Sequence, residues 1–125
     1  VAEAMGLPFV YVRSSPKDHG RENLIEGEVK PGQSVVVIED LISTGKSSLK
    51  AVAALREAGC KVKGMISVFT YGFQLAENNF EKENCQNISL CDYETLLEKA
   101  LESRYISSKD LDTLRKWREQ PETWK

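Results

Sequence analysis

A short segment in the first third of the chain constrains the fold most. Residues 34–40 read SVVVIED, a nearly continuous apolar run that ends in two carboxylates. Runs of this kind are typical of a strand that is covered on both faces, as in a parallel sheet. From Gly45 onward the apolar residues are spaced as on one face of a helix, and Gly59 closes that helix. The sequence therefore predicts a strand, a tight loop and a helix over residues 34–59.

The rest of the chain continues the alternation of strands and helices. Residues 9–12 and 62–69 are rich in aromatic and β-branched side chains, which favours strands. A shorter strand is expected near residues 87–91, and helices are expected at 73–84, 93–104 and 107–117. This alternation predicts an α/β fold with a mostly parallel sheet flanked by helices. With 125 residues, we expect a single domain over 1–125.

The composition excludes several classes of protein. The 17 basic and 19 acidic side chains give a formal net charge of −2, without the basic excess expected of a protein that coats nucleic acid. The longest apolar run, residues 35–38, is far too short to cross a bilayer. The three cysteines lack the spacing of metal ligands, so we expect reduced thiols and no metal site. We expect a cytoplasmic protein that binds neither nucleic acid nor a membrane.

A long polar segment separates the first two predicted strands. Residues 13–27 read RSSPKDHGRENLIEG, with apolar side chains only at Leu24 and Ile25. The abundance of Ser, Pro, Gly, Asp and Asn predicts a loop throughout. Loops of this length inside a compact domain are commonly lids or binding loops, so we expect this segment to take part in binding.

The loop that follows the strand at 34–40 has the composition of a phosphate-binding site. Ser43, Thr44 and Ser47 supply hydroxyl groups, and Gly45 and Lys46 lie where the helix begins. Backbone N–H groups, these hydroxyls and the positive end of the helix dipole would all point to one spot. We therefore predict a phosphate cradle formed by residues 43–47.

Two other interpretations compete for this loop. In the first interpretation the loop has only a structural role: Ser43 or Thr44 caps the helix, and the two preceding carboxylates are ordinary solvated groups. In the other, residues 45–47 are the end of a Walker A motif, whose sequence they match. The first glycine of that motif would fall at position 40, which is Asp40, and a carboxylate there would repel the phosphate. The Walker A interpretation is therefore disfavoured.

Two carboxylates, Glu39 and Asp40, directly precede the cradle. Carboxylates accept hydrogen bonds from vicinal hydroxyl groups, while neighbouring backbone amides bind phosphate. The combination predicts a ligand whose hydroxyl groups lie next to a phosphate, such as a ribose 5-phosphate.

An apolar strand, two acids and a Thr-Gly loop in this order resemble the signature of the type I phosphoribosyltransferases, which bind phosphoribosyl pyrophosphate (PRPP). Further segments are similar to the orotate-specific members: LPFVYVR at 7–13, KDHG at 17–20 and IEG at 25–27. Residues 91–118 also resemble the terminal helices of bacterial members. The resemblance implies the type I phosphoribosyltransferase core fold and phosphoribosyl transfer from PRPP to orotate.

The resemblance also implies a role for each site residue. Glu39 and Asp40 would hold the ribose hydroxyls, and residues 43–47 would surround the 5-phosphate. Pyrophosphate would be bound by Arg13, Lys17 and His19, and the catalytic residues would be Lys17, His19 and Asp40. Without the resemblance, Lys17 and His19 would be interpreted as plain solvated residues of a loop.

A cofactor and a partner are implied as well. Mg²⁺ would be bound mainly through PRPP, without metal ligands from the protein. In the family the loop that corresponds to residues 14–27 closes over the site of the neighbouring subunit, which implies a homodimer. Closure would exclude water that would otherwise hydrolyse PRPP.

Two positions depart from the family pattern. Where the family usually offers an arginine to the pyrimidine, this chain has Tyr71, which is then the implied base-binding residue. Packing is an equally good interpretation of Tyr71 and Phe73. Ser14 stands where many relatives carry a lysine, so fewer contacts to pyrophosphate are expected. Trp117, near the C-terminus, is interpreted as a packing residue.

Three functions stay open at this point. The first is an orotate phosphoribosyltransferase, and the second is a phosphoribosyltransferase for a purine base, which would share the cradle. The third is a PRPP-binding regulator without catalysis, which the cationic loop makes less favoured.

Residues 1–5 read as the end of a helix closed by Gly6, with no N-cap before them. We therefore expect the N-terminal portion, which in the family forms a hood over the base, to be missing, and these residues alone to be weak or inactive.

Overall fold

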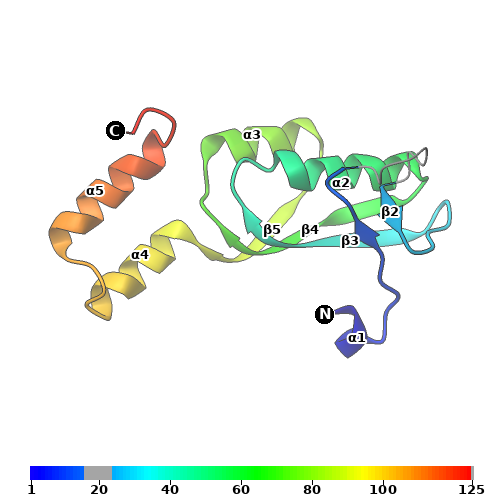
Figure 1. The fold of residues 1–125 in the computed structure, drawn as a ribbon, viewed down its shortest axis with the longest axis horizontal. Helices are drawn as coiled ribbons and strands as arrows, with labels where there is room; N and C mark the ends of the chain where they lie inside the picture. The colour runs from blue at the N-terminus through cyan, green and yellow to red at the C-terminus, as the bar shows by residue number, and fades with distance from the viewer. Residues whose placement is uncertain (16–23, 125) are drawn as a thin grey trace.

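The fold of the chain is an α/β arrangement with one parallel sheet, as the sequence predicts (Figure 1). The computed structural model describes residues 1–15 and 24–124. The elements are, in order, α1 (Ala2–Met5), β1 (Tyr11–Val12), β2 (Ile25–Glu26), β3 (Ser34–Ile42), α2 (Lys46–Glu57), β4 (Lys61–Thr70), α3 (Gln74–Lys82), β5 (Asn87–Asp92), α4 (Tyr93–Glu102) and α5 (Ser108–Glu119). Helices α2 and α3 lie on one face of the sheet (Figure 1).

The main sheet has the strand order β3-β4-β5, with all three strands parallel. In the register, Ile38 lies opposite Ile66, which in turn lies opposite Ile88. A β-bulge interrupts the β3–β4 pairing between Val35 and Val36. Because the strands are parallel, their carboxyl ends meet at one edge of the sheet, and this edge carries the segments that follow β3, β4 and β5.

The core lies between this sheet and helices α2 and α3. The apolar face of α2 contributes Leu49 and Val52, which are buried as the helical spacing predicts. The buried cluster comprises Ile42, Leu49, Val52, Met65, Ala76, Phe80 and Cys85. The core therefore fixes the start of α2 and the end of β3 against α3, and these are the elements that carry the predicted cradle.

The prediction that β3 is covered on both faces is wrong for the described residues. Val36 is 51% exposed and Ile38 is 49% exposed, on the face of the sheet that points away from α2 and α3. The same bare face continues across β4 and β5 through Ile66, Val68, Ile88 and Leu90. The period of the apolar run shows that both faces of the strand favour burial, but it carries no information about which segment covers each face.

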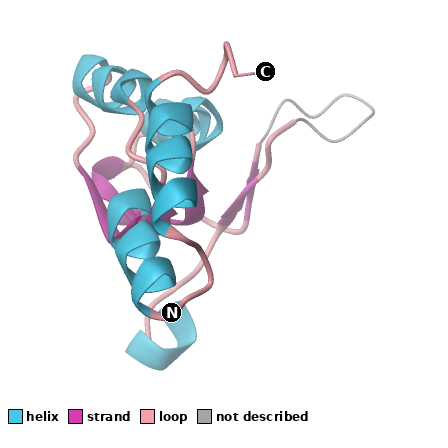
Figure 2. Cartoon of the chain, turned by 90° about the vertical axis from the view of Figure 1, so that its left-hand side faces the viewer, coloured by secondary structure: helices cyan, strands magenta, loops and turns pink. Residues whose placement is uncertain are grey.

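The prediction of a loop throughout residues 13–27 is also wrong, because Ile25–Glu26 forms strand β2. It pairs antiparallel with β1, which is shorter than the predicted strand at 9–12 (Figure 2). Ile25 is buried and packs in a second cluster with Leu55 and Cys60. Ile25 was one of the two apolar side chains in a polar segment, and the free energy of burying it outweighs the local preference for a loop.

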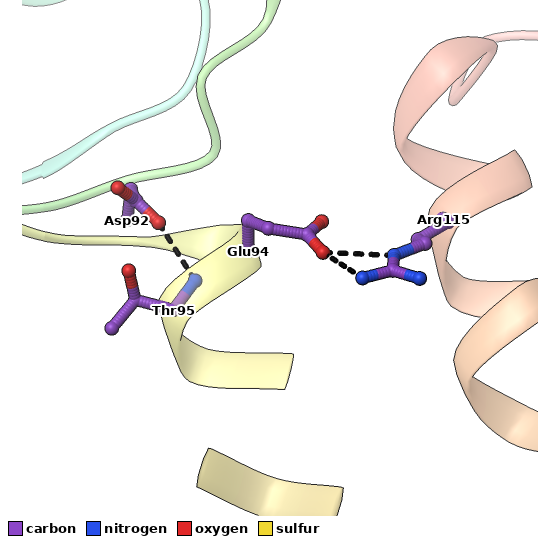
Figure 3. Close-up of polar contacts among 4 residues, drawn as sticks. All are labelled: Asp92, Glu94, Thr95 and Arg115. Carbon is purple, nitrogen blue, oxygen red and sulfur yellow. Dashed lines mark hydrogen bonds and ion pairs between the residues drawn. The ribbon is translucent and has the colours of Figure 1, made fainter. Parts of the chain in front are cut away.

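The C-terminal helices α4 and α5 extend from the carboxyl edge of the sheet (Figure 1). Asp92 is the N-cap of α4, as predicted, and its carboxylate accepts a hydrogen bond from the backbone N–H of Thr95 at 2.8 Å. Arg115 of α5 donates from Nε to Oε1 of Glu94 at 2.8 Å, and this ion pair joins the two helices (Figure 3). Ser107 and Asp110 form the capping box of α5.

Asp92→Ala is expected to destabilise the fold by about 0.5–2 kcal/mol, because α4 loses its capping acceptor. The Thr95 N–H bond holds the pKa of Asp92 below its ordinary value. A lowered folded-state pKa means that the carboxylate stabilises the fold at neutral pH and ceases to do so as the pH falls below about 4. The melting temperatures of Asp92→Ala and the parent should therefore differ at pH 7 and converge in acid. The control Asp112→Ala, at an exposed position of α5, should not show a difference from the parent that disappears in acid.

Candidate functional site

The predicted phosphate cradle lies at the carboxyl edge of the parallel sheet, between β3 and α2. In open α/β sheets this edge is where ligands bind, because loops and helix N-termini converge there. Gly45 is the N-cap of α2 with a φ of 75°, and α2 has no side-chain hydrogen bond at its N-cap. The alternative in which Ser43 or Thr44 caps the helix is therefore wrong, and their hydroxyl groups are not used in that way.

Two residues of α3 hold the cradle in place. Nδ2 of Asn79 donates a hydrogen bond of 2.9 Å to the carbonyl oxygen of Thr44. The ring of Phe80 lies so close to Gly45 that a Cβ atom there would be 2.7 Å from Cε2 of the ring. Sequence reasoning did not find Asn79 or Phe80, because neither belongs to the local motif and only the packing of α3 brings them to the loop.

The two carboxylates that precede the cradle lie inside β3, which continues to Ile42, two residues beyond the predicted end. Successive side chains of a strand point to opposite faces, so Glu39 and Asp40 leave β3 on opposite sides. Asp40 is exposed and Glu39 is half-buried. Oδ1 of Asp40 accepts a 2.7 Å hydrogen bond from the backbone N–H of Leu41, which keeps the carboxylate at the edge next to the cradle.

The residues predicted to bind pyrophosphate belong to the β1–β2 ribbon and the segment that it encloses. Arg13 follows β1 and donates to Oε1 of Glu26 at 2.5 Å, and both side chains are partly exposed. This pair links the end of β1 to β2 across the ribbon. Lys17 and His19 lie outside the described residues. Their assignment as pyrophosphate-binding and catalytic residues stays a prediction.

Tyr71, the residue predicted to bind the base, takes part in an aromatic cluster. Its ring stacks on Phe73 at a centroid distance of 5.3 Å and meets the edge of Phe69 at the same distance. Tyr93 and Trp117 contact it at 5.8 Å and 5.6 Å. The structure thus supports the packing interpretation of Tyr71, Phe73 and Trp117, and a contact between Tyr71 and the base stays a prediction.

Other features of the described residues lie apart from this edge. A cavity of about 450 Å³ is lined by Ile25, Gly27, Glu28, Val29, Lys30 and Ala58. It lies at the amino edge of the sheet, where α2 ends, whereas the cradle lies where α2 begins. Within residues 1–15 and 24–124 there is no group of three or more side chains that could hold a metal ion. No helix in that part of the chain has the length and apolarity needed to span a membrane.

The chain is similar to several curated proteins. It is 60% identical over 124 residues to an orotate phosphoribosyltransferase of Porphyromonas gingivalis, covering 99% of this chain and 59% of that protein. It is 56% identical to the orotate phosphoribosyltransferase of Bacteroides fragilis and 54% identical to that of Bacillus caldolyticus, covering 99% of this chain in both comparisons and 58% and 60% of those proteins. The chain therefore spans about three-fifths of the length of the curated relatives it matches. No family model matches it.

Solved structures share the fold. The structure of Leishmania donovani UMP synthase superposes with a TM-score of 0.77 at 28% identity, covering 95% of this chain and 25% of that one. An orotate phosphoribosyltransferase from Aeropyrum pernix gives a TM-score of 0.70 at 31% identity, covering 78% of this chain and 54% of that one. The TM-scores show that the chain shares its fold with the matched part of both structures. With a strand-to-helix cradle at the carboxyl edge and 54–60% identity to these relatives, the chain is similar across nearly all of its residues to the orotate phosphoribosyltransferases, which are type I phosphoribosyltransferases.

Proposed function

We propose that the protein containing this chain is an orotate phosphoribosyltransferase of pyrimidine nucleotide (UMP) biosynthesis. It would transfer the 5-phosphoribosyl group of PRPP to orotate and release orotidine 5′-monophosphate and pyrophosphate. The observation that carries the proposal is the 60% identity to a relative of that name over 99% of the chain, a stretch that includes the whole cradle.

The cradle residues would bind the 5-phosphate of PRPP. The first turn of α2 directs its N–H groups and the positive end of the helix dipole toward the loop, and no side chain caps them. The hydroxyls of Ser43, Thr44 and Ser47 add donors, and Asn79 and Phe80 hold the loop backbone in place for them. Glu39 and Asp40 would accept hydrogen bonds from the ribose hydroxyls.

The leaving group would be stabilised by cations. Arg13, Lys17 and His19 are the protein groups proposed for the pyrophosphate, on which negative charge grows as the ribosyl centre becomes oxocarbenium-like. Mg²⁺ would neutralise part of that charge. The ion would be held mainly by the oxygens of PRPP, which are hard ligands of the kind that Mg²⁺ prefers.

A homodimer in the cytoplasm is the proposed form of the protein. The segment 14–27 would close over the neighbouring subunit's site and exclude water during transfer. Support comes from the β1–β2 ribbon, which forms a two-stranded sheet of its own, apart from the main sheet (Figure 2).

A test of base choice addresses the proposed function directly. The complete natural protein, supplied with PRPP and Mg²⁺, should release pyrophosphate with orotate and not with adenine, guanine or hypoxanthine. Release with a purine and not with orotate would support a purine-base phosphoribosyltransferase instead. PRPP binding without release for any base would indicate a regulator.

A further inference from the structure

Arg118, in the last turn of α5, lies at the carboxyl edge of the sheet beside the segment that follows β4. A Cβ atom placed on Gly72 would be 3.4 Å from Nη1 of Arg118, so the guanidinium lies directly against the backbone there. The end of α5 approaches the start of α3 at this edge (Figure 1). A cationic side chain from the far end of the chain is thereby brought next to the edge that carries the cradle.

The position of Arg118 is fixed by its neighbour Trp117. The indole lies 5.6 Å from the ring of Tyr71, 5.8 Å from Phe73 and 5.4 Å from Tyr93, measured between centroids. Aromatic contacts of this kind are directional and bury large surfaces, so they hold the end of α5 in one place. The guanidinium is therefore presented from a packed element rather than from a free helix end.

Within the described residues, the Arg118 guanidinium forms no hydrogen bond or ion pair with another side chain or carbonyl group. The two nearest acids have other partners, because Glu94 is paired with Arg115 and Asp92 caps α4. Arg118 nevertheless contributes to the lowered pKa of both carboxyl groups, because its positive charge favours their ionised forms. A half-buried guanidinium with five free donors favours a planar anion.

The segment that lies against Arg118 adjoins the strand that leads into the cradle. The backbone N–H of Tyr71 donates to the carbonyl oxygen of Ile42 at 3.1 Å, so the segment at Tyr71 and Gly72 adjoins the end of β3. Neighbouring strands lie about 4.8 Å apart. A ligand with its phosphate in the cradle after β3 and its ribose across the edge would bring its base over the end of β4, beside Gly72.

We propose that Arg118 determines base specificity by binding the carboxylate of orotate. This inference rests on the proposed function. Guanidinium and carboxylate form two parallel hydrogen bonds, a geometry that neither lysine nor a neutral donor reproduces. The aromatic cluster then has a functional consequence, because Trp117 positions the arginine that selects the base.

The test compares Arg118→Gln and Arg118→Lys with Arg115→Gln in the complete natural protein. Arg115→Gln removes the same charge from α5 and breaks its ion pair with α4, so it reports any effect of loosening the helix. For each variant, KM and kcat are measured with orotate and PRPP, together with inhibition by the neutral carboxamide of orotate. Circular dichroism verifies that each variant is folded.

Arg118→Gln is expected to raise the KM for orotate about 10- to 100-fold, the loss expected for a charge-assisted bidentate contact, with the KM for PRPP within twofold of the parent. Inhibition by the carboxamide should not weaken, and Arg118→Lys should lie between Arg118→Gln and the parent. The inference is overturned if orotate and its carboxamide weaken equally, if Arg115→Gln has the same effect, or if Arg118→Gln changes nothing while the parent uses orotate. A parent that does not use orotate overturns the proposed function as well.

Discussion

Asp40→Asn is expected to weaken PRPP binding about 10- to 100-fold, with a smaller effect on orotate. The exposed carboxylate of Asp40 lies next to the cradle and is positioned by the N–H of Leu41. Hydrogen bonds between a carboxylate and hydroxyl groups contribute about 1.5–3 kcal/mol each, and an amide keeps the shape but loses the charge. Loss of one such contact therefore corresponds to one to two orders of magnitude in the dissociation constant of PRPP.

Calorimetric titration of PRPP into the complete natural protein measures this change. Asp112→Asn serves as the matched control, because it removes the same charge from an exposed position of α5 and should leave binding unchanged. Glu39→Gln indicates whether the half-buried acid on the opposite face of β3 contributes as well. Unchanged PRPP affinity in Asp40→Asn would remove Asp40 from the ribose site and would leave the ribose hydroxyls to Glu39 alone.

Local patterns were sufficient to predict the strand–loop–helix unit that carries the continuous part of the candidate site. The apolar run at 34–40, the two acids and the glycine that begins α2 all act within one strand–loop–helix unit, whose geometry follows from backbone preferences. The N-cap at Asp92 and the capping box at Ser107 were predictable for the same reason, since capping joins residues three apart.

The groups that hold the site in place were not predictable from these patterns. Asn79 and Phe80 reach the cradle only because α3 packs on the same face as α2. Arg118 reaches Gly72 because Trp117 enters the aromatic cluster, and nothing in the spacing of α5 indicates that contact. The predictions for β2 and for the exposed face of the sheet failed for the same reason, since both features depend on which distant segment covers an apolar side chain.

Gly45→Ala is expected to damage the cradle and the core together. Gly45 has a φ of 75°, and a Cβ atom there would lie 2.7 Å from Cε2 of the buried Phe80 ring. The left-handed conformation costs a non-glycine residue about 1–2 kcal/mol, and overpacking adds about 1–3 kcal/mol. We therefore expect a total loss of about 2–5 kcal/mol in the free energy of unfolding, and at least a tenfold loss of PRPP affinity because the loop must move away from Phe80.

Gly32→Ala separates these two causes. Gly32 also has a left-handed φ of 84°, but a Cβ atom there would meet nothing within 4 Å. Its substitution should cost only the conformational part, about 1–2 kcal/mol, and should leave PRPP affinity unchanged. Adding Phe80→Leu to Gly45→Ala should recover part of the PRPP affinity, because the smaller side chain makes room for the new methyl group. If Gly45→Ala and Gly32→Ala lose equal stability and both bind PRPP normally, then the contact with Phe80 does not set the shape of the cradle, and the loop is held by Asn79 and its own backbone.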